Sequence, residues 1–249
     1  MDKNIDNQWF KVVEIEVNSR CNLKCSYCPN SILPTPDVPE YMSDEVFERI
    51  INELIKINFS GRISYHFYNE PLLRKDLERL VAQVKEKLPN VYQLLFTNGI
   101  LLSEERYINL KKAGIDHFLV TLHDNITSIP ERPYQSIRLP KDIMLSNRGG
   151  TLFKRKNTLH LPCYAPSKHL IVTVNGNLLL CGDDAKRCIK TGNIIEQSIE
   201  DVWFSEKFIK VRELLKNGQR DIASAICKYC NNKEHYDNID RKQNYPALV

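Results

Sequence analysis

The sequence predicts an α/β protein, built as a partial (β/α) barrel with a small C-terminal unit of a β-hairpin and a helix. Over the first 150 residues, short apolar runs alternate with amphipathic helical segments, the pattern of βα units in a parallel sheet or barrel. After about residue 150, two β-rich runs flank Asn175-Gly176, a strong hairpin signal. We therefore expect domains at 1–150 and 151–235 and a polar tail at 236–249, with loose chain from Asn231 onward.

The expected barrel strands are short and apolar, as buried parallel strands are. Val13, Ile15 and Val17 alternate with Glu14 and Glu16, which predicts a half-buried first strand. The other expected strands are Ile63–Phe67, Leu94–Thr97, Phe118–Thr121 and Ile143–Leu145. Prolines between residues 121 and 143 discourage a full helix there, so we expect a barrel that is short at its far edge.

Helical segments separate most of these strands. One begins after Ser43, a good N-cap, and carries an apolar face to about residue 57. A second runs from Leu77 until Pro89 stops it, and a third extends from Ser103 to Gly114, a plausible C′ glycine. In the C-terminal unit we expect one helix over about 199–216.

Composition narrows the class of protein. The chain of 249 residues is 42% hydrophobic and 27% charged, as ordinary soluble globular proteins are. The sequence has no run of ~18 apolar residues, so we expect no membrane span. It has no apolar segment near the N-terminus, so we expect no secretory signal. The net charge of +4 is spread along the chain and does not indicate a nucleic-acid partner. We expect a cytoplasmic protein, in which eight cysteines favour metal or cluster ligation over disulfides.

The first cysteine motif follows the first expected strand. Cys21, Cys25 and Cys28 form a C-x3-C-x2-C motif, and three thiolates in one loop suit three irons of a [4Fe–4S] cluster. The fourth iron then stays open for a substrate or cofactor. Zinc would need a fourth ligand, which nothing adjacent supplies.

With this motif the chain resembles the radical S-adenosylmethionine (SAM) superfamily. The resemblance implies that SAM binds the open iron, that a flavodoxin- or ferredoxin-type protein supplies an electron, and that a 5′-deoxyadenosyl radical abstracts hydrogen from substrate. It also implies SAM contacts for Tyr27 at the adenine, Glu70 at the amine, and Asn98 and His123 near the cofactor. By themselves, Thr97-Asn98-Gly99 favours a plain turn and His123 favours a solvated loop residue.

A second cysteine set lies in the C-terminal unit: Cys163, Cys181, Cys227 and Cys230. Spacing alone allows either a four-thiolate zinc site or a fully ligated [4Fe–4S] cluster. The order C-x12-G-x4-C followed by C-x2-C resembles the twitch domain, a shortened SPASM domain of radical SAM enzymes. That resemblance implies an auxiliary [4Fe–4S] cluster that accepts an electron.

Longer stretches resemble the radical SAM dehydrogenases of aminoglycoside antibiotic biosynthesis, at residues 14–19, 61–73, 145–150, 172–174 and 192–194. This implies oxidation of a secondary alcohol on an aminocyclitol or amino sugar to a ketone. Arg148 is implied near the reacting hydroxyl, where a permanent charge suits alkoxide stabilisation, and Tyr68 and Asp183 at the substrate. Gly182-Asp183 is small, which would fit a larger precursor. Structural roles for all three side chains stay open.

Two other functions stay open at this stage. A radical epimerase would use Cys188 as its hydrogen-atom donor, whereas a structural Cys188 is expected to be a buried small hydrophobe. A zinc-stabilised binding module would have no radical chemistry at all. Iron content and SAM cleavage separate the last of these from the enzymes.

Overall fold

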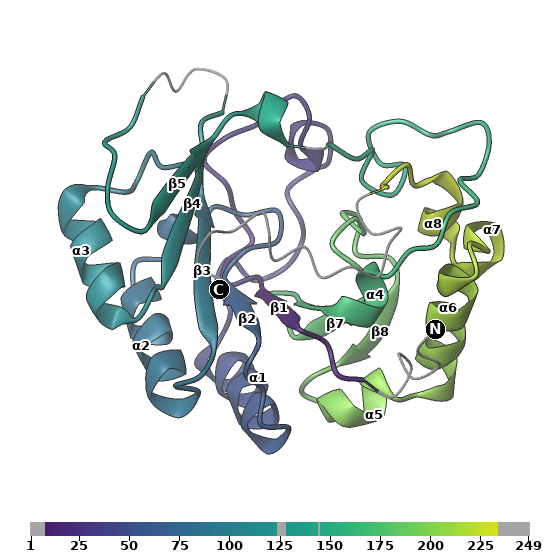
Figure 1. The fold of residues 1–249 in the computed structure, drawn as a ribbon, viewed down its shortest axis with the longest axis horizontal. Coiled ribbons are helices and arrows are strands. Elements are labelled where there is room, and N and C mark those ends of the chain that lie inside the picture. Colours follow the sequence, from purple (N-terminus) through teal and green to yellow (C-terminus); the bar gives the residue numbers. More distant parts are fainter. Residues whose placement is uncertain (1–7, 124–127, 144, 234–249) are drawn as a thin grey trace.

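The computed structural model describes residues 8–123, 128–143 and 145–233. One sheet of eight strands runs through this part of the chain in the order β5-β4-β3-β2-β1-β6-β7-β8 (Figure 1). Its strands are β1 (Val12–Ile15), β2 (Arg62–Ser64), β3 (Tyr92–Thr97), β4 (His117–Thr121), β5 (Gln135–Arg138), β6 (His169–Val172), β7 (Asn177–Leu179) and β8 (Lys190–Asn193). The sheet ends at β5 and β8 without closing, so the partial barrel is confirmed.

Strands β1 to β6 pair in parallel, and β7 and β8 are antiparallel additions. Helices α1 (Asp44–Lys56), α2 (Leu77–Lys87) and α3 (Glu104–Ala113) cover the outer side of the parallel strands (Figure 1). The hydroxyl oxygens of Ser43 and Ser103 cap α1 and α3 as expected, and Gly114 ends α3 at φ +128°. The apolar sides of these elements form the main core.

The C-terminal half begins with α4 (Ala165–Lys168) and the expected hairpin of β6 and β7, in which Gly176 adopts φ +80°. The expected single helix over 199–216 is wrong. It divides into α5 (Ile199–Trp203) and α6 (Glu206–Lys216), because the Ser205 hydroxyl accepts a hydrogen bond from the amide of Phe208 and starts a new helix. Two short helices follow, α7 (Arg220–Ala223) and α8 (Ala225–Tyr229).

Two strand predictions are also corrected. The fifth strand is Gln135–Arg138, and neither Ile143 nor Leu145 lies in a strand. Pro140 opens a short 3-10 turn just before Ile143, and the real strand is a half-exposed edge with a polar sequence that carries little apolar signal. In the first strand segment, Glu16 is fully buried rather than solvated. No described helix has the length and apolar character needed to span a membrane.

The boundary near residue 150 stays a prediction. The sheet itself crosses it, because β6 pairs in register with β1 from Val12↔His169 to Ile15↔Val172. The connection from β5 to α4 carries the chain from one edge of the sheet to β6, which lies beside β1 (Figure 1). Residues from both halves therefore face the same interior.

Candidate active site

A cavity of about 940 Å³ lies against the inner face of the sheet. Side chains alternate along each strand, so one set packs against the helices and the other faces this cavity. Glu14 from β1, Arg62 from β2, Phe96 from β3 and Thr121 from β4 all line it. The carboxyl ends of the parallel strands meet at one end, where active sites of barrels lie.

The first set of thiols borders this cavity. Cys21, Cys25 and Cys28 all line it, and the Cys28 amide donates to the carbonyl of Cys25 at 2.9 Å. Burial raises the pKa of the Cys21 thiol to about 11, and the neighbouring Glu70, Cys28 and Cys25 add to this rise. A cation that binds these thiols would remove this penalty, because ligation deprotonates them.

Glu70, expected at the SAM amine, accepts hydrogen bonds from the end of β3 and from the turn that directly follows Glu70 itself. Its Oε1 accepts from the hydroxyl of Thr97 at 2.8 Å and from the amide of Leu72 at 3.0 Å, and its Oε2 accepts from the amide of Asn98 at 2.8 Å. Burial raises the pKa of this carboxyl, and the hydrogen bonds oppose that rise. The fixed carboxylate lines the cavity with the three thiols.

The other expected SAM contacts lie together on this wall. Tyr27 and His123 form a side-chain hydrogen bond between the cysteine loop and the end of β4. Asn98 donates from its side chain to Asn22 Oδ1 at 2.8 Å, which joins the end of β3 to the same loop. Sequence reasoning missed Asn22, because its partner is distant in the chain.

The second set of thiols lies around a small pocket next to the cavity. Cys163, Cys181, Cys227 and Cys230 line one small pocket, and Cys181 also borders the large cavity. Burial raises the pKa of Cys181 well above its ordinary value, and the charges of Asp183 and the other three thiols add to this effect. No three described His, Cys, Asp or Glu side chains converge on a single metal ion. A cluster needs less convergence, since each thiolate binds its own iron.

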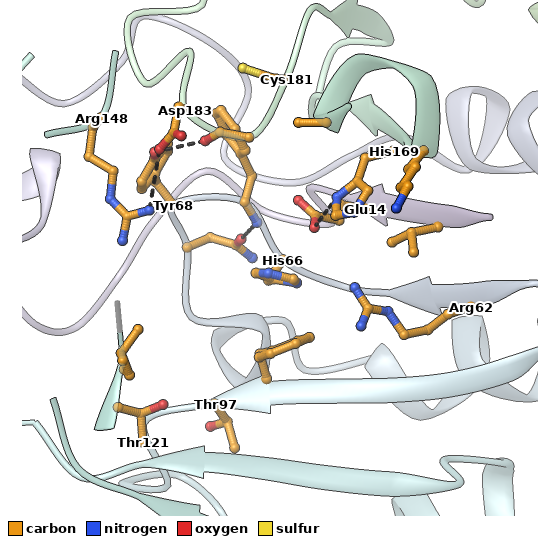
Figure 2. A pocket seen from close by; sticks show the side chains of 18 of the residues that line it. Glu14, Arg62, His66, Tyr68, Thr97, Thr121, Arg148, His169, Cys181 and Asp183 are labelled. Carbon is orange, nitrogen blue, oxygen red and sulfur yellow. Dashed lines mark hydrogen bonds and ion pairs between the residues drawn. The ribbon is translucent and has the colours of Figure 1, made fainter. Parts of the chain in front are cut away.

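The three expected substrate residues lie close together on the cavity wall (Figure 2), and Tyr68 interacts electrostatically with both Cys28 and Cys181. Arg148 Nη1 lies 3.6 Å from Asp183 Oδ1, and its guanidinium lies 5.7 Å from the Tyr68 ring centre. Burial lowers the pKa of Arg148, but Tyr68, Asp183 and Cys28 outweigh it and raise the pKa above the ordinary value. Arg148 Nε is buried with no hydrogen-bond partner among the described residues. The guanidinium is therefore a charged donor beside the cavity.

Both carboxylate oxygens of Asp183 accept hydrogen bonds from other side chains of the protein. Its Oδ1 accepts from the hydroxyl of Ser146, and its Oδ2 accepts from the side chain of Asn232 at 2.6 Å. The Tyr68 hydroxyl donates to the carbonyl of Gly182 at 2.8 Å.

The expectation of loose chain from Asn231 is wrong at its start, since the Asn231 side chain accepts a hydrogen bond from the amide of Asn147 at 2.7 Å. The tail at 236–249 lies outside the described residues.

A polar group deeper in the cavity was not expected from the sequence. His169 Nδ1 lies 3.5 Å from Glu14 Oε1, and His66 and Arg62 lie nearby (Figure 2). Burial alone would raise the pKa of Glu14, but the hydrogen bond from His169 and the neighbouring basic groups lower it to about 2. Burial lowers the pKa of His66 to about 4, so this imidazole is neutral near pH 7.

Cys188 lies apart from this cavity. Its side chain is exposed, and its thiol donates to Asp184 Oδ1 at 3.2 Å. It is not among the cavity-lining residues. The expected buried hydrophobe is therefore wrong, because the turn directs this thiol toward Asp184 and solvent.

Comparisons with known proteins agree with this geometry. The model of the radical SAM superfamily matches residues 15–125, and that of the SPASM iron–sulfur cluster-binding domain matches residues 163–231. The chain is 37% identical over 247 residues to the S-adenosyl-L-methionine-dependent 2-deoxy-scyllo-inosamine dehydrogenase of Niallia circulans, covering 92% of this chain and 98% of that one. The chain belongs to the radical SAM superfamily.

Solved structures of known proteins are similar to this radical SAM protein over most of its length. The crystal structure of BtrN in complex with AdoMet and 2-DOIA matches with a TM-score of 0.86 and 36% identity, over 93% of this chain and 97% of that chain. BtrN in an open conformation matches with a TM-score of 0.77 and 34% identity, over 94% and 100% of the two chains. A PqqA peptide cyclase of Granulibacter bethesdensis is 30% identical over 158 residues, 59% of this chain and 41% of that one.

The radical SAM enzyme uses SAM and two iron–sulfur clusters, one in each matched domain. The donor sets fit: three thiols with an open position face the large cavity, and four thiols surround a closed pocket. The two expected cysteine sets therefore lie at separate pockets of the fold, and Cys181 lines both pockets. Their seven cysteines come from segments up to about 200 residues apart, which only the fold brings together.

Proposed function

We propose that this radical SAM oxidoreductase oxidises a secondary alcohol of an aminocyclitol or amino sugar to a ketone, as a step of aminoglycoside-type antibiotic biosynthesis. The relative from Niallia circulans is named for such an oxidation. One observation carries the proposal: a single cavity is lined by the thiols of the first set, by Cys181 of the second, and by Arg148, Tyr68 and Asp183, with Tyr68 in electrostatic range of both Cys28 and Cys181. A substrate held there would lie between the radical source and the electron acceptor.

When bound, the cofactors supply a 5′-deoxyadenosyl radical at one end and a one-electron acceptor at the other. With both groups held by these residues, the alcohol would lose a hydrogen atom to the radical, a proton to solvent or a base, and one electron to the acceptor. The chain must hold the carbinol carbon toward the first thiol set and exclude water from the cavity.

Arg148 suits the hydroxyl end of this substrate. Its pKa is raised, so it stays protonated and acts as a donor and positive charge rather than as a base. Burial raises the pKa of Tyr68 well above its ordinary value, so its neutral hydroxyl remains bonded to Gly182. Asp183, bonded to Ser146 and Asn232, orients Arg148 and offers a negative charge to an ammonium group of the substrate.

The SAM contacts are part of the same proposal. Glu70 would bind the amine, Tyr27 and His123 the adenine side, and Asn98 would order the loop beside them. A flavodoxin- or ferredoxin-type protein would supply the first electron. Residues 1–150 would generate the radical and residues 151–235 would accept the electron. We place the enzyme in the cytoplasm, where thiol ligands stay reduced.

Epimerisation has less support. It would need a hydrogen-atom donor beside the substrate carbon, and Cys188 is exposed and bonded to Asp184 away from the cavity. Turnover in deuterated water distinguishes the outcomes. Solvent deuterium at the substrate carbon of an inverted product would contradict the dehydrogenase, whereas ketone without inversion supports it.

The direct test begins with anaerobically reconstituted protein and a panel of aminocyclitols and amino sugars. We expect about eight irons, as two [4Fe–4S] clusters, and a ketone product from at least one substrate. Changing Cys21, Cys25 and Cys28 together to Ala should halve the iron and abolish SAM cleavage. Zinc in place of the second set of irons would contradict the electron-acceptor role.

A second variant isolates the oxidation step. With Cys163, Cys181, Cys227 and Cys230 changed to Ala, the folded protein should still cleave SAM slowly and move deuterium from the carbinol carbon into 5′-deoxyadenosine. It should form little ketone, because the second electron has no acceptor. Ketone at the wild-type rate would show that the auxiliary cluster is structural. Circular dichroism confirms that the variant is folded.

A further inference from the structure

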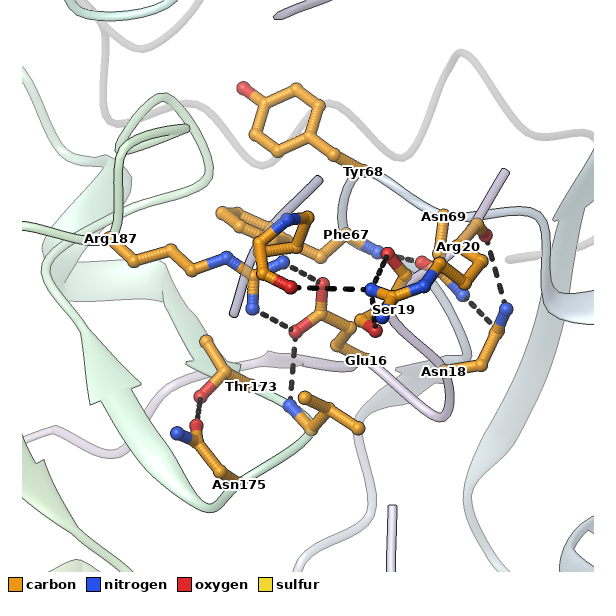
Figure 3. A network of polar contacts seen from close by, with 12 residues as sticks. Glu16, Asn18, Ser19, Arg20, Phe67, Tyr68, Asn69, Thr173, Asn175 and Arg187 are labelled. Carbon is orange, nitrogen blue, oxygen red and sulfur yellow. Dashed lines mark hydrogen bonds and ion pairs between the residues drawn. The ribbon is translucent and has the colours of Figure 1, made fainter. Parts of the chain in front are cut away.

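A buried ion pair joins the first strand segment to the loop that carries Cys181. Glu16, with no exposed surface, follows β1 and accepts from Arg187 Nη1 at 2.7 Å and from Arg187 Nη2 at 2.6 Å (Figure 3). It also accepts from the amide of Val174 at 3.0 Å. A bidentate arginine–carboxylate pair fixes direction as well as distance.

Arg187 belongs to a loop with several internal hydrogen bonds. The segment from Cys181 to Cys188 closes on itself, because Asp184 accepts from the amides of Cys188 at 3.1 Å and Ile189 at 2.7 Å. The amide of Asp184 in turn donates to the carbonyl of Cys181 at 3.2 Å, and that of Arg187 to the carbonyl of Asp184 at 2.9 Å. A contact that fixes Arg187 therefore also fixes Cys181 and its neighbour Asp183.

Glu16, the other member of the pair, lies a few residues before the first thiol set in the sequence. Asn18 lies two residues after Glu16 and bonds to the loop after β2, accepting from the side chain of Asn69 at 2.7 Å and donating to the carbonyl of Glu70 at 3.2 Å. Cys21 follows three residues later. One short segment thus contacts both the loop after β2 and the loop that carries Arg187 (Figure 3).

We infer that Glu16 and Arg187 are a positioning pair that fixes the auxiliary-cluster loop relative to the radical-generating side of the cavity. The inference rests on the proposed oxidation, in which the substrate's second electron passes to this loop's cluster. Apolar residues of similar volume would stabilise the fold as well or better, since buried charges are costly to desolvate. What the charged pair adds is a defined orientation, and the guanidinium also lies 5.6 Å from the Phe67 ring centre, next to Tyr68.

The test compares Arg187→Gln, Arg187→Lys and a control, Glu53→Gln, in the reconstituted holoenzyme. Arg187→Lys keeps the charge but loses the fork, so it protects folding. Glu53 is a matched control because it is buried and pairs with Lys56 at 2.5 Å. It also joins the two halves of the chain by accepting from the amide of Ile199 at 3.1 Å, but it has no hydrogen bond to the loop of Cys181 to Cys188.

Two quantities are measured. The first is amide hydrogen exchange of segment 181–190, which needs no substrate. The second is 5′-deoxyadenosine formed per ketone, which counts radicals that are generated without completed oxidation. We expect faster exchange and a rise in this ratio on the order of tenfold in Arg187→Gln, since a misplacement of ~1 Å costs up to 10²-fold. Arg187→Lys should show an intermediate rise, and Glu53→Gln neither change.

Each outcome decides the inference. Unchanged exchange and an unchanged ratio in both Arg187 variants would overturn it and leave the pair a structural contact. Equal changes in Glu53→Gln would overturn it too, because they would reflect general loosening. Loss of auxiliary iron confined to the Arg187 variants supports it. Wild-type protein that forms no ketone from any substrate contradicts the proposed function instead, and the exchange measurement still tests the pair.

Discussion

Replacement of His66 by Phe should make folding stability less dependent on pH. The His66 side chain is half-buried at the cavity with its Nδ1 atom inaccessible, its ring centre lies 4.2 Å from that of Phe96, and desolvation lowers its pKa from 6.5 to about 4. Between about pH 6.5 and about pH 4, the unfolded chain therefore binds a proton at this site and the folded chain does not. The free energy of unfolding decreases as the pH is lowered through this range. Phe keeps the aromatic packing and removes the titration.

The magnitude follows from this shift. A pKa difference of about 2.5 units corresponds to roughly 3 kcal/mol in full, of which about 2 kcal/mol develops between about pH 7.5 and about pH 5. Glu14, whose pKa is about 2 in the fold, is ionised throughout that window and changes stability only at lower pH. The wild type should thus lose about 2 kcal/mol more than His66→Phe over this range.

Urea unfolding of the holoenzyme, followed by far-ultraviolet circular dichroism at both pH values, measures this difference. His160→Phe is the matched control for loss of a histidine, because His160 is exposed and does not line the cavity. Identical pH dependence in wild type and His66→Phe would refute the reasoning, because it would show that the imidazole is protonated equally in the folded and unfolded states.

Three further predictions concern the site. Arg148→Gln should lower the rate of ketone formation on the order of 10²-fold while SAM cleavage persists, because the alkoxide loses its charged donor; an unchanged rate would exclude that role. Glu70→Gln should weaken SAM binding roughly tenfold in calorimetric titration, since a charge-assisted hydrogen bond becomes neutral; an unchanged affinity would place the amine elsewhere. Cys188→Ala should keep turnover and change unfolding free energy by less than about 1 kcal/mol, as the residue is exposed; loss of product with continued 5′-deoxyadenosine formation would favour the epimerase.

Local signals carried most of the fold. Helix caps such as Ser43 and Ser103, and the left-handed glycine in Asn175-Gly176, act within a few residues, so the sequence predicts them and the structure confirms them. The edge strand Gln135–Arg138 was missed because a polar edge strand forms through its pairing with β4 rather than through its own pattern.

The sequence by itself determined the chemistry. Cysteine spacing within a loop is a local property, so Cys21, Cys25 and Cys28 predict an open iron–sulfur site without any knowledge of the fold. Tertiary structure alone decided what surrounds it. The pairs of Glu14 with His169 and of Glu16 with Arg187 join residues more than 150 positions apart, at side chains that look like a strand's solvated face. No local pattern encodes such contacts, because desolvation and pairing of these charges arise only when the sheet brings both halves together.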